Sequence, residues 1–96
     1  MVEIEATFKT ITLKYNGITL IDDYKGYDRL IVLISVVLFM TKDKKAVFDW
    51  CCSGSDEGKT VKLGYYDLFR INEELNRKRR KLVESLENYY KNRYGR

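Results

Sequence analysis

Five consecutive basic residues, Arg77-Lys78-Arg79-Arg80-Lys81, form the densest concentration of charge in this 96-residue sequence. Lysine and arginine side chains bind phosphate groups, and on a helix five consecutive positions span about 400°, so these charges would face all directions. Glutamates at i,i+4 spacing could pair with some of them, at about 0.3–0.5 kcal/mol per pair, but Arg79 and Lys81 have no such carboxylate. A solvated helix and a phosphate-contacting helix both fit this pattern.

Residues suited to catalysis or metal binding are scarce. The sequence has no histidine, which removes the commonest general base and metal ligand, and the adjacent Cys51 and Cys52 cannot complete a zinc site. Ser53–Thr60 partly matches the phosphate loop G-x-x-x-x-G-K-[ST], but Ser53 replaces its first glycine, and Asp56 and Glu57 would repel phosphate. We therefore expect a hairpin loop here, no enzymatic activity, no metal and no cofactor.

Aromatic residues are the second unusual feature. Eight of them are tyrosines, and most lie near Lys or Arg, as at Tyr89 and Tyr90. Proteins that bind single strands combine aromatic stacking on bases with basic contacts to phosphate. A tyrosine can equally pack its ring and leave its hydroxyl in water.

Length and composition indicate one domain over residues 1–96, with an excess charge of +4 and a pI near 9.1. The positive excess lies mainly in the C-terminal segment. No signal peptide is recognisable, and the apolar run Leu30–Met40 is too short to span a membrane, so we expect a cytoplasmic protein with no membrane partner.

The elements expected before residue 65 are antiparallel strands. Asn16-Gly17 predicts a two-residue hairpin turn, with Tyr15 paired to Ile18, Leu13 to Leu20 and Ile11 to Asp22. A bulge near Lys9-Thr10 would bring the alternating residues Val2, Ile4, Ala6 and Phe8 onto the same face. Further strands are expected over residues 29–40, 46–52 and 59–63. The β-branched run within 29–40 favours a central strand, with a buried helix as the alternative.

A helix is predicted over residues 65–94, because Leu68, Leu75, Leu82 and Tyr89 recur every seven residues. Gly95 would end it. The fold class is thus α+β: a four- or five-stranded antiparallel meander (1–64) followed by one long C-terminal helix (65–94). At about 40 Å the helix is longer than a small sheet can cover. Either it bends near Asn76, or its second half packs on a partner, and we expect a homodimer through Leu75, Leu82, Leu86 and Tyr89.

The segment Gly58-Lys59-Thr60-Val61-Lys62-Leu63, which leads into the helix, resembles the end of the positive cofactor four family of single-stranded DNA-binding proteins. The resemblance covers about a third of the chain, and Leu68 stands where the family has a buried tryptophan. It implies a dimer that binds single strands across its sheet. Lys59 and Lys62, with Trp50 or Phe48, would then be the contacts.

These observations favour a non-enzymatic nucleic-acid-binding protein whose target is single-stranded DNA or RNA. The expected contacts are basic and aromatic: Lys59, Lys62, Trp50, Arg77, Arg79, Arg80 and Lys81. The alternative is a small viral or phage-type protein that binds a host protein through the apolar stripe of the long helix and inhibits or modulates it.

Overall fold

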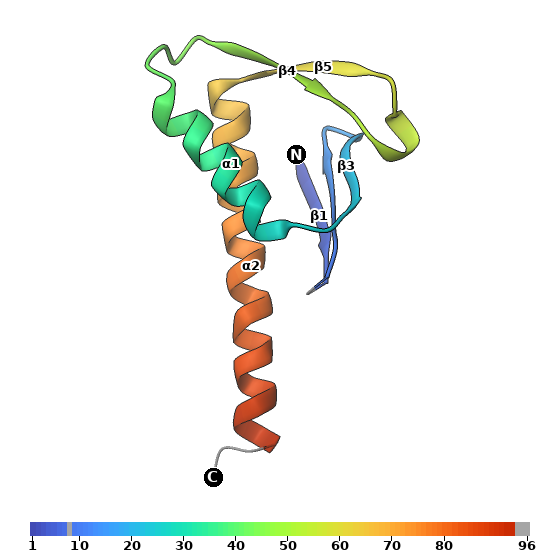
Figure 1. Ribbon diagram of the computed structural model, residues 1–96, viewed down its shortest axis with the longest axis vertical. Helices are drawn as coiled ribbons and strands as arrows, with labels where there is room; N and C mark the ends of the chain where they lie inside the picture. The colour runs from blue at the N-terminus through green and yellow to red at the C-terminus, as the bar shows by residue number, and fades with distance from the viewer. Residues whose placement is uncertain (8, 94–96) are drawn as a thin grey trace.

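The computed structural model describes residues 1–7 and 9–93, and within them an α+β fold with five strands and two α-helices (Figure 1). Three strands form one antiparallel sheet in the order β1-β2-β3, and two form a separate hairpin, β4-β5. The expected meander is therefore divided into two sheets by a helix. The elements in chain order are β1 (Val2–Ala6), β2 (Ile11–Tyr15), β3 (Ile18–Tyr24), α1 (Tyr27–Met40), β4 (Val47–Cys51), the 3₁₀ turn η1 (Gly54–Asp56), β5 (Thr60–Gly64) and α2 (Tyr65–Arg93).

The β2–β3 hairpin turns at the expected dipeptide. Asn16 and Gly17 have positive φ angles of 50° and 82°, and Tyr15 pairs with Ile18. The rest of the predicted register is wrong, because Leu13 pairs with Ile21 and Ile11 with Tyr24. The irregularity lies in β3 rather than at Lys9-Thr10, and it turns the consecutive residues Leu20 and Ile21 both inward. Phe8 and Gly95 fall outside the described residues.

The prediction of a central strand over residues 29–40 is also wrong, because this segment is the helix α1. Leu30, Ile34 and Leu38 recur every four residues and are buried, as one face of a helix requires. The run of 14 residues exceeds the usual length of a strand, and a continuous apolar run carries no strand periodicity. Neither helix of the described residues is long and apolar enough to cross a membrane.

The core lies between the two sheets and the two helices. Buried side chains of β2, β3, β5, α1 and α2 form one cluster together with Cys52. Apolar residues of β1 and β4 are partly buried and pack against this cluster. On α2 the buried residues are Leu68, Ile71 and Leu75. Leu75 is 0% exposed, so its assignment to a dimer interface is wrong: it packs inside its own chain.

Helix α2 continues well past the core. It keeps helical geometry to Arg93 without a break at Asn76, and every residue from Val83 to Arg93 is exposed. In Figure 1 this half of α2 extends alone below the rest of the molecule and gives the chain its elongated outline of 51 × 31 × 20 Å. We call residues 83–93 the arm and residues 1–76 the body.

Two polar contacts fix where α2 begins. The Asp67 carboxylate accepts a hydrogen bond from the backbone N–H of Gly64 at 2.8 Å and another from the Tyr15 hydroxyl. The first satisfies an N–H at the start of the helix, and the second ties that start to β2. These bonds lower the pKa of Asp67 below its usual range and raise that of Tyr15.

Candidate nucleic-acid interface

Trp50, the stacking residue expected from the sequence, lies on the inner face of the β4–β5 hairpin. Its side chain is partly buried against the core, and its indole Nε1–H donates to the carbonyl oxygen of Leu20 at 3.0 Å. Phe48, on the same face of β4, is also packed on the core. Neither ring is therefore displayed as an open stacking surface.

Lys62 lies on the opposite face of this hairpin. It is paired across the strands with Asp49, at 3.3 Å between Lys62 Nζ and Asp49 Oδ1. Because neighbouring residues of a strand point to opposite faces, Asp49 and Lys62 face solvent where Trp50 and Val61 face the core. The structure does not bring Trp50 and Lys62 together on one surface.

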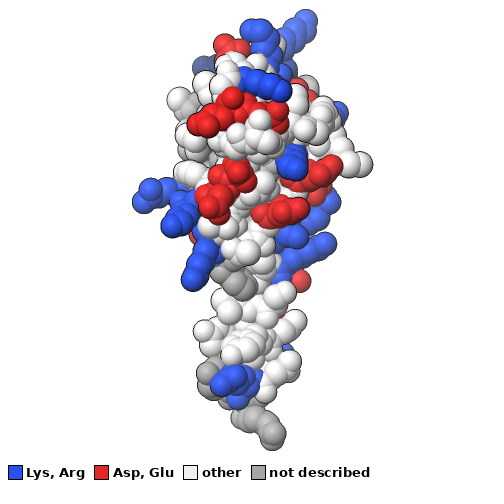
Figure 2. All heavy atoms as spheres, turned by 90° about the vertical axis from the view of Figure 1, so that its right-hand side faces the viewer, with Lys and Arg blue, Asp and Glu red and all other residues white. Residues whose placement is uncertain are grey.

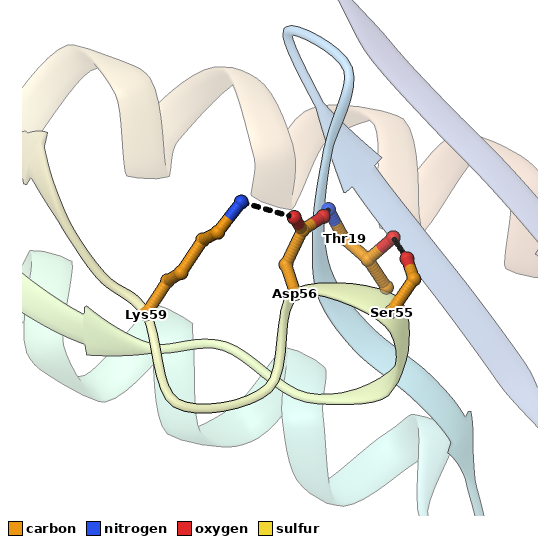
Figure 3. A network of polar contacts seen from close by, with 4 residues as sticks. All are labelled: Thr19, Ser55, Asp56 and Lys59. Carbon is orange, nitrogen blue, oxygen red and sulfur yellow. Dashed lines mark hydrogen bonds and ion pairs between the residues drawn. The ribbon is translucent and has the colours of Figure 1, made fainter.

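Lys59 belongs to a polar contact that fastens the loop 53–58 to β3 (Figure 3). Its Nζ lies 3.0 Å from Asp56 Oδ1, while Asp56 Oδ2 accepts the backbone N–H of Thr19 at 2.8 Å. Ser55 adds a hydroxyl contact to Thr19 at 3.1 Å. Because β3 is an edge strand, these side chains satisfy backbone groups that would otherwise be open to another strand. The bonds from Thr19 and Lys59 lower the pKa of Asp56.

The basic run of α2, residues 77–81, is the second predicted site, and we call it the collar. Arg77 pairs with Glu74 at 2.6 Å. Arg79, for which no carboxylate was expected, pairs with Asp28 at the start of α1, and this contact raises its pKa further. Within the described residues the other three side chains, Lys78, Arg80 and Lys81, have no ion pair.

The arm carries exposed aromatic side chains next to further basic ones. Tyr89 and Tyr90 are each 52% exposed as residues, and their rings meet edge to face at 5.5 Å between centroids. The guanidinium of Arg93 lies 5.8 Å from the centre of the Tyr89 ring. Lys91 is also exposed. Aromatic faces and cations that alternate on a projecting helix can contact bases and phosphates together.

Other tyrosines near basic residues have structural roles. The Tyr27 hydroxyl donates to the backbone carbonyl of Leu75 at 2.7 Å, and burial raises its pKa to about 12. Lys44 lies over the ring of Tyr65, 4.0 Å from its centre. Tyr94 is outside the described residues. Among the tyrosines of α2, Tyr66, Tyr89 and Tyr90 are the exposed ones in the described part.

The body and the C-terminal residues 77–96 carry net charges of opposite sign. Residues 77–96 hold eight Lys or Arg and two Glu, a net +6, whereas residues 1–76 hold ten basic and twelve acidic residues, a net −2. Together these give the +4 of the whole chain. On the face seen in Figure 2, basic and acidic side chains are interspersed over the body. Residues 77–93 of α2, with seven basic and two acidic residues, hold +5 of this charge, which is more than the net charge of the whole chain.

Sequence reasoning missed two features of this surface. Lys78 was not among the predicted contacts; in the structure Glu74, which stands four residues before it, pairs with Arg77, so Lys78 has no ion pair within the described residues. The outer face of α1 was missed because its residues were assigned to a strand. The apolar length of that run was the signal that could have identified it.

No cluster of three or more Cys, Asp or Glu side chains suited to a metal ion occurs within residues 1–7 and 9–93. Comparison with known proteins finds no matching family, curated protein or solved structure.

Proposed function

We propose that this chain is a non-enzymatic nucleic-acid-binding protein that uses the collar and the arm of α2, with single-stranded DNA or RNA as its favoured target. The observation that carries the proposal is the division of charge, with +6 on residues 77–96 against −2 on the body. A polyanion is attracted to the first region and weakly repelled by the second, so its orientation on the protein is set by electrostatics.

Four cations carry most of the expected phosphate contact. Lys78, Arg80, Lys81 and Lys91 have no carboxylate partner in the described part of the chain, so they can bind phosphate without first breaking an ion pair. Arg77 and Arg79 would first have to leave Glu74 and Asp28. Lys59 and Lys62, which the family resemblance implicates, likewise hold Asp56 and Asp49, and we assign them a smaller part.

The preference for single strands rests on the arm. Tyr89 and Tyr90 present ring surface that an unpaired base can stack on, at about 1–3 kcal/mol per base. A duplex offers its bases only at their edges, so it would gain the phosphate contacts without the stacking. We place this binding in the cytoplasm, where the thiols of Cys51 and Cys52 stay reduced.

Fluorescence anisotropy with labelled single- and double-stranded oligonucleotides tests the proposal. Four phosphate contacts to a single strand give a slope of log K against log salt near −3, so affinity should fall about 50-fold between 50 and 200 mM salt. Replacing Lys78, Arg80 and Lys81 by Gln should reduce that slope by about 2 units. The matched control replaces Lys9, Lys14 and Lys25, three exposed lysines of the body, and should leave the slope within about half a unit of the wild type. Equal effects of the two triple variants would refute the assignment to the collar.

A protein partner remains the second candidate, because the second half of α2 also has an apolar stripe. Leu82, Leu86 and Tyr89 follow the i, i+4, i+7 spacing by which amphipathic helices dock into grooves, and Leu86 is 39% exposed. On the face seen in Figure 2 the arm is largely free of charged side chains. A host protein bound through this stripe would lose affinity on Leu86→Asp and respond little to salt, whereas nucleic-acid binding would show the opposite pattern.

A further inference from the structure

Helix α1 is apolar on every side. Between Leu30 and Met40 its only polar residue is Ser35, and beyond the buried inner face its outer face consists of Val32, Leu33, Val36, Phe39 and Met40. These five side chains are between 52% and 88% exposed. A helix that is apolar all round is normally buried, and a contiguous exposed patch of this kind marks an interface.

The outer face of α1 contains both a hollow and a projection that could fill it. The hollow has a volume of about 540 Å³ and lies along the first half of the helix, where Tyr24, Val32, Leu33 and Val36 provide its apolar lining. Phe39, at the other end, is the most exposed apolar side chain of the face at 88%. It lies on the opposite side of the helix from the buried residues, so the chain's own core does not use it.

A surface that carries a projection and its receiving hollow is self-complementary, as an interface between two identical chains with two-fold symmetry must be. We propose that a second copy of this chain docks on α1, with the two α1 helices antiparallel and Phe39 of each copy in the hollow of the other. Setting Phe39 opposite Leu33 of the partner copy places the two-fold axis at Val36, midway between them. This interface differs from the long-helix interface predicted from the sequence, and it does not depend on nucleic-acid binding.

The charges at the two ends of α1 favour the antiparallel arrangement. Three carboxylates, Asp22, Asp23 and Asp28, lie at or just before its start, and Lys25, Arg29 and the Arg79 that pairs with Asp28 balance them. The turn after α1 carries Lys42, Lys44 and Lys45 against Asp43. Antiparallel packing brings the net-positive end of one copy to the carboxylate-containing, neutral end of the other, whereas parallel packing would bring the two net-positive ends together.

The same charges argue against a lipid surface as the occupant. Helices that lie on anionic membranes have basic residues along the whole polar face. Here the side of α1 opposite the apolar patch is the protein core, and the carboxylates at its first end would be repelled by anionic lipid.

Sedimentation equilibrium at 10–200 μM protein gives the first test. The expected mass is twice the 11.4 kDa of one chain for the wild type and 11.4 kDa for Phe39→Asp, which should keep its far-UV circular dichroism because Phe39 is exposed. Leu86→Asp, on the arm, should remain a dimer. Loss of the dimer in Leu86→Asp but not in Phe39→Asp would overturn the proposal. A wild type that is monomeric at 200 μM would also overturn it, whether or not that monomer binds lipid vesicles.

Cysteine cross-linking tests the position of the axis, in a Cys51→Ser background where Cys52 is buried. Val36→Cys lies at the proposed axis and should form a disulfide-linked dimer on mild oxidation. Met40→Cys stands four residues away, so two such residues would be about 12 Å apart in an antiparallel pair and should not cross-link. Equal cross-linking at both positions would indicate a parallel pair and contradict the antiparallel arrangement.

Discussion

Replacing Asp67 by Asn should destabilise the chain, because Asp67 fastens the start of α2 to β2. The carboxylate accepts one hydrogen bond from the N–H of Gly64 at 2.8 Å and one from the buried Tyr15, whereas the side chain of Asn offers a single acceptor oxygen. One of the two bonds is therefore lost, together with a negative charge at the N-terminus of a helix.

The size of the effect follows from these two losses. A hydrogen bond to a charged group contributes about 1.5–3 kcal/mol, and partial exposure of the Asp67 side chain places the loss near the lower end of that range. The charge at the helix N-terminus adds about 0.3–1 kcal/mol. We expect the free energy of unfolding to fall by about 2 kcal/mol, which for a domain of this size corresponds to a decrease in Tm of roughly 8–16 °C.

Urea denaturation followed by circular dichroism measures this loss. The matched control is Glu84→Gln, which removes the same charge from the exposed arm and should change stability by less than about 0.5 kcal/mol. Combining Tyr15→Phe with Asp67→Ala, which removes both bonds, should give a destabilisation smaller than the sum of the two single changes by about 1 kcal/mol, because both changes remove the bond between Tyr15 and Asp67. Additive effects, or equal losses in Asp67→Asn and Glu84→Gln, would refute this role of Asp67.

Three further results are expected. As the pH falls from about 5 to 3, the free energy of unfolding of the wild type should fall more steeply than that of Asp67→Asn. The pKa of Asp67 is lower in the folded chain than its unfolded-state value near 4, so the ionised carboxylate stabilises the fold above that pH, and this contribution is lost as the carboxylate is protonated. Parallel pH curves for the two proteins would contradict this expectation. Leu75→Ala should cost about 2–5 kcal/mol because Leu75 is fully buried, while Leu86→Ala on the arm should cost less than about 1 kcal/mol in urea denaturation, and similar values would contradict the assignment of Leu75 to the core. A thiol reagent should modify the exposed Cys51 rapidly and Cys52 slowly, because burial hides the Cys52 thiol and raises its pKa; equal rates in the folded protein would contradict this.

The sequence predicts those elements whose signals are local. Asn16-Gly17 forms the expected turn because both residues tolerate positive φ, and α2 is found because its apolar residues repeat with helical spacing from Leu68 to Tyr89. The segment 29–40 is predicted wrongly because a continuous apolar run has no period. Its β-branched residues favoured a strand, whereas its length, which favoured a helix, was given less weight. The β3 irregularity falls within residues 19–24, and there the N–H groups of Thr19 and Asp22 donate to side chains of the loop 53–58, a long-range contact that no local pattern encodes.

The candidate site could be predicted in part. The basic run 77–81 is visible in the sequence, and the structure places it at the boundary between the body and the arm. What the sequence could not indicate is which charges are neutralised, because Arg79 finds Asp28 across 51 positions of sequence and Lys62 finds Asp49 through strand pairing. The inward orientation of Trp50 likewise follows from the packing of β4 on the core rather than from any motif.

The central claim, that nucleic acid binds along the collar and the arm, is tested most directly by an NMR titration of ¹⁵N-labelled protein with a short single-stranded oligonucleotide at about 50 mM salt, where phosphate contacts are strong. We expect the largest changes in amide chemical shift between residues 77 and 93, with small changes over β4 and β5. The largest changes over residues 47–64, or no change at a several-fold excess of oligonucleotide, would contradict it.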